Sequence, residues 1–300
     1  MSKLLNVSEA VSQYVNDGDT VYAAGFTHLI PFAAGHEIIR LKKRDLVLAR
    51  ATPDLIYDQM VAADCARKVI FSYMGNPGVG SLRILRSAIE QGRLEWEEYS
   101  HFGMITRLQA GASGLPFLPM NQTGASDLEN VNPNIQRIPD PFGGKDVIAV
   151  RALNPDVAIV HVQRADNEGN AHLWGIIGEQ KEAAFAAKKV ILTAEEIVDA
   201  SVIRSDPNRT MIPGIIVSAV CHIPFACHPS YAQGYYDRDN EFYLQWDKLS
   251  ESNESVKSWL DEWVYGLSDR GQYWQKLGEQ THTRLKVKPH YSEKINYGKY

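Results

Sequence analysis

The sequence predicts an α/β fold, in which an open, largely parallel sheet is layered with helices in a single large domain over residues 1–300. Three observations favour it. Short apolar runs alternate with segments of helical periodicity, which is the pattern of βαβ units. A strand that ends at Gly25 leads into an apolar helix after Pro31. The length of 300 residues also allows a sizeable core.

The first third of the chain follows this alternation closely. Ser8 caps a short amphipathic helix that ends at Asn16, and a turn at Asp17-Gly18 leads into the first buried strand. Because the sheet is expected to be parallel, each strand is followed by a helix that crosses over it. We expect strands at Thr20–Ala24, Leu46–Arg50, Lys68–Ser72 and Leu94–Tyr99, and helices at Phe32–Lys43, Pro53–Ala63, Ser81–Gln91 and His101–Ala112.

Residues 116–145 interrupt the alternation, because they are rich in Pro, Gly, Asn and Asp and have no periodicity. They predict an irregular but ordered excursion within the domain. A C-terminal helical region is expected from about residue 239 onward. Within it, Asn253–Leu267 has apolar residues at helical spacing. Between these regions we expect strands at Asp146–Val150, Val157–Val162, Val190–Thr193 and Ile215–Cys221, the last of them central, and a helix at Glu179–Ala187.

Composition excludes several classes of protein. The net charge of −5 argues against a nucleic-acid binder, which usually has a basic face. No signal peptide is evident, and no apolar run reaches the ~18 residues of a membrane span, so no membrane partner is expected. The three cysteines, Cys65, Cys221 and Cys227, have no framework spacing and fit free thiols in a reducing compartment. The expected location is the cytoplasm.

Two motifs could be mistaken for known sites. Cys221-His222 and Cys227-His228 form a doublet, but zinc requires closer pairs and a second cluster, so no metal is expected. His161 lies within an apolar strand and is expected to be a hydrogen-bonded core histidine. Gly75 to Ser81 follows a strand and precedes a helix without the spacing of a dinucleotide or Walker loop. It is either a plain turn or a loop whose N–H groups line a substrate site.

The residues alone therefore indicate a ligand-binding α/β chain without a self-contained catalytic set. Aromatic residues gather between Tyr231 and Trp246, where they belong either to the core or to a subunit interface. The ligand site itself is expected at the carboxyl ends of the strands, near the strand that ends at Gly25.

Three separated segments together resemble the α subunit of class I coenzyme A transferases, in the glutaconate and 3-oxoadipate branches. The match rests on their order and spacing over most of the chain. They are Asp17-Gly18-Asp19 through Gly25-Phe26-Thr27, Leu115-Pro116-Phe117-Leu118-Pro119, and Asn154-Pro155-Asp156 through Gly169-Asn170, followed by Trp174-Gly175, Thr193-x-Glu195-Glu196 and His228-Pro229-Ser230.

The resemblance implies a heteromeric 3-oxoacid CoA-transferase that is active only with a β subunit, in an α2β2 assembly. The nucleophilic glutamate would lie on the β subunit, so no catalytic residue is expected on this chain. CoA would move from an acyl-CoA, with succinyl-CoA as the best guess, to a carboxylic acid such as 3-oxoadipate, through a glutamyl-CoA thioester. The coenzyme A thioester would be a substrate, and no tightly bound cofactor is implied.

The residues expected to line the acyl pocket come from three loops: Gly25, Phe26, Thr27 and His28; Met74, Gly75 and Asn76; and His101. Glutaconate-type members have basic residues after Gly-Phe-Thr, whereas this chain has His28-Leu29-Ile30, and Tyr235 to Asn240 resembles the 3-oxoadipate branch. His101 aligns with a glutamate of the related ring-opening hydrolases, which favours transfer. The alternatives are part of a CoA-ester hydrolase, a glutaconate-type transferase and a non-catalytic acyl-CoA-binding protein.

Overall fold

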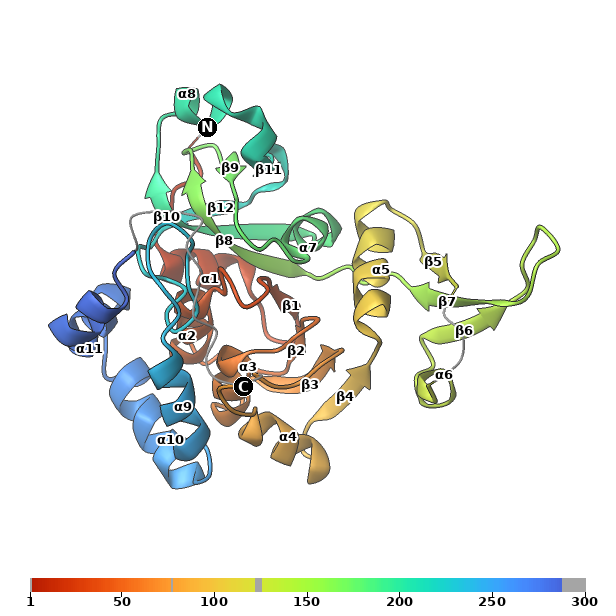
Figure 1. Ribbon diagram of the computed structural model, residues 1–300, viewed down its shortest axis with the longest axis horizontal. Coiled ribbons are helices and arrows are strands. Elements are labelled where there is room, and N and C mark those ends of the chain that lie inside the picture. Colours follow the sequence, from red (N-terminus) through yellow and green to blue (C-terminus); the bar gives the residue numbers. More distant parts are fainter. Residues whose placement is uncertain (1, 77, 122–125, 288–300) are drawn as a thin grey trace.

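The computed structural model describes residues 2–76, 78–121 and 126–287, and its main element is a nine-stranded sheet (Figure 1). Seven strands pair in parallel in the order β12-β10-β8-β1-β2-β3-β4, and the short β9 and β11 add antiparallel pairs. The strands are β1 (Thr20–Ala23), β2 (Leu46–Ala49), β3 (Ala66–Phe71), β4 (Glu95–Glu98), β8 (Val157–Ala165), β9 (Ala171–His172), β10 (Lys189–Ile197), β11 (Thr210–Ile212) and β12 (Ala219–His222).

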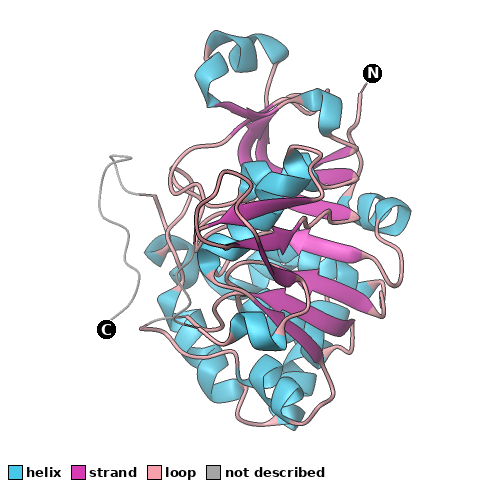
Figure 2. Ribbon diagram, turned by 90° about the vertical axis from the view of Figure 1, so that its right-hand side faces the viewer, coloured by secondary structure: helices cyan, strands magenta, loops and turns pink. Residues whose placement is uncertain are grey.

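Helices cover both faces of this sheet (Figure 2). Alternate residues along β1 and just after it enter two different cores: Val21 and Ala23 lie in one, and Tyr22 and Ala24 in the other. The predicted α/β fold with a largely parallel, open sheet is therefore confirmed. The helices are α1 (Val7–Tyr14), α2 (Phe32–Arg40), α3 (Leu55–Ala62), α4 (Arg83–Glu90), α5 (His101–Ala112), α7 (Gln180–Ala186), α8 (Ala200–Ser205), α9 (Asn240–Leu249), α10 (Asn253–Leu260) and α11 (Arg270–Arg284).

The order of the strands reverses between β1 and β8, which are neighbours in the sheet. From β1 the chain adds β2, β3 and β4 on one side, whereas β10 and β12 extend the sheet from β8 on the other. Because all these strands are parallel, their carboxyl ends lie at one edge. A reversal of this kind opens a crevice at that edge, where ligands of α/β proteins bind.

The predicted central strand Ile215–Cys221 is wrong in length and in place. Residues Gly214–Ile216 form a short 3-10 turn, and among the described strands β12 pairs only with β10. Its outer side is covered by the N-terminal segment, where Val220 exchanges backbone hydrogen bonds with Lys3 and Leu5. This cover makes an edge strand as apolar as a central one, which is why the composition misled the prediction.

A small three-stranded sheet projects from the body beside α5 (Figure 1). It has the antiparallel order β5-β7-β6, with β5 (Phe117–Met120), β6 (Ile135–Ile138) and β7 (Val147–Arg151), and a short helix α6 (Leu128–Val131) precedes β6. The stretch 116–145 thus contains regular structure that the sequence did not predict, and the expected strand at Asp146–Val150 joins this arm. Pro119 in β5 and the exposed polar pair Gln136-Arg137 in β6 hid the strand pattern.

A buried carboxylate joins the arm to the main sheet. Glu97 in β4 accepts hydrogen bonds from Lys68 of β3 at 2.6 Å, from Arg107 of α5 at 3.0 Å and from Asn134 next to β6 at 3.1 Å. The Arg107 guanidinium also lies 4.2 Å from the centre of the Tyr99 ring. Three elements therefore depend on one side chain.

Replacing Glu97 with glutamine is expected to lower the free energy of unfolding by about 2–4 kcal/mol, because Arg107 and Lys68 would lose the charge that compensates them. Chemical denaturation measures the change. Glu129→Gln is the matched control in the arm, since the Glu129–Arg137 pair is partly exposed and its loss should cost about 0.5 kcal/mol or less. Equal losses for the two variants would contradict the role of Glu97.

Five of the six aromatic residues between Tyr231 and Trp246 belong to the core, and Tyr235 is half-buried against it. Tyr231, Tyr236, Tyr243 and Trp246 are all buried, so they offer no apolar surface to a partner. The Tyr243 hydroxyl donates to Asp54, and the indole N–H of Trp246 donates to Asp58, which ties α9 to α3. Of the two alternatives that the sequence left open, the core is correct.

Within the described ranges, no helix is long and apolar enough to cross a membrane.

Candidate active site

The loop that follows β1 reverses tightly at the carboxyl edge, at the point where the strand order changes. Gly25 has a φ of +134°, and Thr27 and Leu29 have φ values of +55° and +54°. A Cβ atom on Gly25 would lie 2.8 Å from the carbonyl oxygen of His28 and 3.0 Å from that of Leu29. Only glycine fits where the backbone folds back on itself so closely.

His28 is fully buried and joins this loop to two others. Its Nε2 accepts a hydrogen bond from the N–H of Gln233 at 3.0 Å, so the proton is on Nδ1, which donates to the carbonyl of Ile176 at 3.0 Å. Its ring lies 4.6 Å from the Tyr231 ring. Burial lowers the pKa of His28 to about 4, so the imidazole is neutral. Both ring nitrogens bind backbone groups, and the side chain fixes the loops in place.

Phe26 follows β1 and His101 follows β4, and the two side chains meet at the edge. Their ring centres are 5.7 Å apart in an edge-to-face arrangement. His101 is exposed at the start of α5, and its Nδ1 lies 3.1 Å from the Ser72 hydroxyl. That hydroxyl donates its hydrogen to the Ala51 carbonyl at 2.6 Å, so it accepts from the histidine. A nucleophilic serine needs the opposite polarity, so this pair is not a catalytic dyad.

Met74, Gly75 and Asn76 lie on a turn that packs against α9. The N–H of Asn76 donates to the Gly80 carbonyl at 3.1 Å, and Asp247 of α9 accepts from the N–H of Ser81 at 2.9 Å. Asn76 is buried, and Met74 is partly buried against the core. Among the described residues, no hydrogen bond or ring contact joins Met74–Asn76 to Gly25–His28. The predicted site residues therefore form two separate groups: Gly25–His28 with His101, and Met74–Asn76.

Arg50 was not recognised as a site residue from the sequence. It directly follows β2, is only 1% exposed, and its Nη2 donates to the Gly25 carbonyl at 2.6 Å. Within the described part of the chain, its Nε and Nη1 have no hydrogen-bond partner. The signal in the sequence is weak: a charged residue ends the apolar run Leu46–Ala49 beside the strand that leads into the Gly25 loop.

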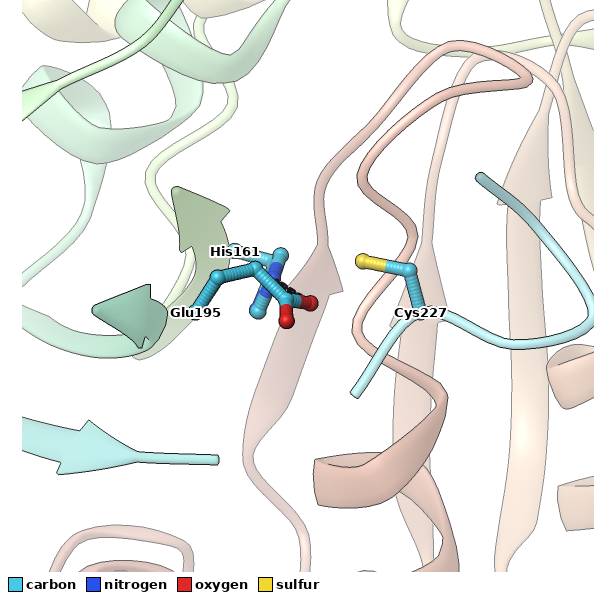
Figure 3. A group of neighbouring side chains, drawn as sticks. All are labelled: His161, Glu195 and Cys227. Atoms are coloured by element: carbon cyan, nitrogen blue, oxygen red, sulfur yellow. Dashed lines mark hydrogen bonds and ion pairs between the residues drawn. The ribbon is translucent and has the colours of Figure 1, made fainter. Parts of the chain in front are cut away.

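A buried group of His161, Glu195 and Cys227 lies beneath these loops (Figure 3). His161 pairs with Thr193 at 2.8 Å through Nδ1 and with Glu195 at 2.9 Å through Nε2. The Glu195 carboxylate also accepts from the Tyr236 hydroxyl at 2.7 Å and from the N–H of Phe225 at 2.8 Å. Burial raises the pKa of the Cys227 thiol.

The three side chains have the proximity of a metal site, with ligand atoms within 4.8 Å of one another. Hydrogen bonds account for the arrangement, however, because both nitrogens of His161 and both oxygens of Glu195 already have protein partners. The prediction of a hydrogen-bonded core histidine is confirmed for His161. The group stabilises the loop after β12 against β8 and β10.

Residues 4–222 match the coenzyme A transferase family. The chain belongs to this family. It is 51% identical over 282 residues to the A-subunit of the 3-oxoadipate CoA-transferase of Pseudomonas knackmussii, covering 93% of this chain and 99% of that one. It is 35% identical to the A-subunit of the glutaconate CoA-transferase of Acidaminococcus fermentans, covering 96% of each.

The crystal structure of glutaconate coenzyme A-transferase from Acidaminococcus fermentans has a similar fold, with a TM-score of 0.89 at 34% identity over 96% of both chains. The CoA-transferase resemblance seen in the sequence is therefore confirmed. The Pseudomonas and Acidaminococcus relatives are each named as the A-subunit of an enzyme, which implies a partner subunit for this chain too.

Proposed function

We propose that this chain is the α subunit of a heteromeric 3-oxoacid CoA-transferase that moves CoA from succinyl-CoA to 3-oxoadipate. The 51% identity to the A-subunit of a 3-oxoadipate CoA-transferase, over nearly its whole length, carries this proposal. The proposal includes an α2β2 assembly in the cytoplasm. The CoA thioester serves as substrate, and no tightly bound cofactor takes part.

The chemistry uses a glutamate on the β subunit and proceeds in two half-reactions. The glutamate carboxylate attacks the thioester carbonyl, which forms an acyl-glutamyl anhydride and releases CoA thiolate. The thiolate attacks the glutamyl carbonyl, so that the donor acid leaves and a glutamyl-CoA thioester remains. The acceptor carboxylate then displaces CoA to form a second anhydride. Attack of the thiolate on its acyl carbonyl gives the new acyl-CoA and restores the glutamate.

The α subunit shapes the acyl pocket and excludes water, which would hydrolyse the anhydride and thioester intermediates. Gly25, Phe26, Thr27 and His28 form one wall, with His101 in contact with Phe26. The turn Met74–Asn76 is a second wall, built on α9. His28 acts by fixing its loop, because its ring nitrogens are already engaged.

Exposed apolar side chains near this edge support a β subunit that completes the site there. Tyr73 follows β3 and is 49% exposed, and Phe102 in the first turn of α5 is 61% exposed. Ile176 and Ile177, on the segment that His28 holds, are 36% and 40% exposed. Large apolar side chains that gather at a polar edge are typical of a protein interface.

Replacing Phe102 with aspartate is expected to weaken association with the β subunit by a factor of about 30 or more, because a buried charge would replace an aromatic anchor. Analytical ultracentrifugation of the mixed subunits measures it. Ile215→Asp makes the same change at a 91% exposed side chain that follows β11, and it should leave association unchanged. If both variants assemble normally, the partner does not cover Phe102.

Co-expression with the adjacent reading frame, followed by an assay of succinyl-CoA with and without 3-oxoadipate, tests the proposed function. CoA should pass to the acid only when both chains are present. Free thiol without any acceptor would identify a hydrolase instead. Transfer by this chain alone would contradict the shared active site.

A further inference from the structure

Arg50 carries a buried charge that no acid neutralises directly. The side chain is 1% exposed, and no described carboxylate lies within the 4.0 Å of an ion pair. Among the described residues, the hydrogen bond of its guanidinium goes to the Gly25 carbonyl, and Nε and Nη1 have no partner. Glu179 is a buried acid whose Oε1 accepts from the Tyr22 hydroxyl at 2.9 Å, and its Oε2 has no hydrogen-bond partner among the described residues. An uncompensated buried charge is costly, so its retention calls for a function.

The carbonyl oxygens of two peptide groups in this loop accept hydrogen bonds from side chains outside the loop. Arg50 holds the carbonyl of Gly25, and the Ser230 hydroxyl holds that of Thr27 at 2.8 Å. In a trans peptide the N–H points opposite to the carbonyl. The N–H groups of Phe26 and His28 therefore point away from these anchors.

The N–H groups of Phe26, Thr27 and His28 are also unoccupied. Within residues 2–76, 78–121 and 126–287 none of them has a hydrogen-bond partner, and neither has the Thr27 hydroxyl. The sign of φ alternates along the loop, being positive at Gly25, Thr27 and Leu29 and negative at the two residues between them. Backbone in which φ changes sign from residue to residue can turn successive N–H groups to one side, which is the geometry of anion-binding nests.

We propose that the loop Phe26–His28 binds the distal carboxylate of the acyl group, and that Arg50 is the positioning residue that orients the loop and supplies its positive potential. The inference rests on the proposed function and assigns the part of the site that recognises the second, non-reacting carboxylate of its substrates. Since both half-reactions use the same pocket, the loop selects donor and acceptor by the same charge.

A permanent carboxylate fits these features better than the transient oxyanion of the reaction. The guanidinium is charged in every state of the enzyme, so it favours a ligand that is charged in every state. The reacting carbonyl must face the glutamate of the other subunit, whereas this loop belongs wholly to the α subunit. The strained φ of Thr27, a β-branched residue in the left-handed region, is also a common mark of a functional loop.

The test compares two acceptors with the assembled enzyme of both subunits: a dicarboxylic acid and its monoamide, which is neutral at the distal end. The wild-type enzyme should have a kcat/KM for the dicarboxylate at least about tenfold higher than for the monoamide. In Arg50→Met this preference should fall to near one, mainly through KM of the dicarboxylate, and Arg50→Lys should retain part of it. Arg107→Lys, at a buried arginine paired with Glu97, should keep the wild-type preference.

The outcomes separate the inference from the proposed function. Equal slowing of both acceptors in Arg50→Met would overturn the inference, because a merely structural arginine would give that result. So would a wild-type enzyme without preference, a measurement that needs no variant to fold. If the complex transfers no CoA, the proposed function fails, and calorimetry with succinate and its monoamide still decides the inference. Tighter binding of succinate would support it, and equal affinities would overturn it.

Discussion

Replacing Gly25 with alanine is expected to reduce the CoA-transferase activity of the assembled enzyme about 100-fold or more and to destabilise the chain by about 2–4 kcal/mol. The φ of +134° is strained for any residue with a side chain, and the new Cβ would lie within 3.0 Å of two backbone oxygens. Backbone atoms cannot move aside as a flexible side chain can, so the loop from Phe26 to His28 would have to change its path.

Gly18→Ala is the matched control, because Gly18 precedes the same strand at its opposite end. Its φ is +85°, and a Cβ there would meet nothing within 4 Å. It should therefore cost about 1 kcal/mol of stability and no activity. Steady-state kinetics and chemical denaturation of both variants, each assembled with the β subunit, measure the two effects. Full activity in Gly25→Ala would show that the path of this loop does not matter to the reaction.

Most of the main sheet could be predicted from the sequence because its strands are short apolar runs between clear helices. The helix predicted at His101–Ala112 has the same bounds in the structure. The prediction failed where a strand is buried by contacts that its own apolar pattern does not indicate. The apolar run near β12 is buried by the N-terminal segment. The arm strands add only a few residues to the core, namely Met120, Ile135, Ile148 and Val150, and Pro119 and polar residues between them obscure the pattern.

The sequence predicted the location of the candidate site better than it predicted the roles of the residues there. The glycine after β1 marked the loop, and family resemblance added His101, which does meet Phe26. The role of Arg50 depends on β1 and β2 being neighbours, so that a side chain after one strand reaches the carbonyl after the other. His28 looked like a ligand-binding residue, but its hydrogen bonds to Ile176 and Gln233 come from segments about 150 and 200 residues away in sequence. No local pattern contains such information.

Acid is expected to destabilise the chain between about pH 6.5 and pH 4, because His28 and His228 are held neutral in the fold. Burial lowers the pKa of each to about 4 from its ordinary value of 6.5. In this window the unfolded chain binds a proton at each site and the folded chain does not, so stability falls as the pH falls. Each histidine accounts for a loss of roughly 3 kcal/mol, which is complete near pH 4.

Asp58 acts in the opposite direction and provides the contrast for the measurement. Burial raises its pKa to about 6, so the folded chain binds this proton first and gains stability between about pH 6 and pH 4. The free energy of unfolding should be measured from pH 4.5 to 6 for the wild type, His28→Gln and Asp58→Asn. His28→Gln should flatten the dependence by about 1.4 kcal/mol per pH unit, and Asp58→Asn should steepen it by a similar amount. Parallel curves for the wild type and His28→Gln would mean that the folded and unfolded chains bind the His28 proton equally, which would contradict a lowered pKa of His28.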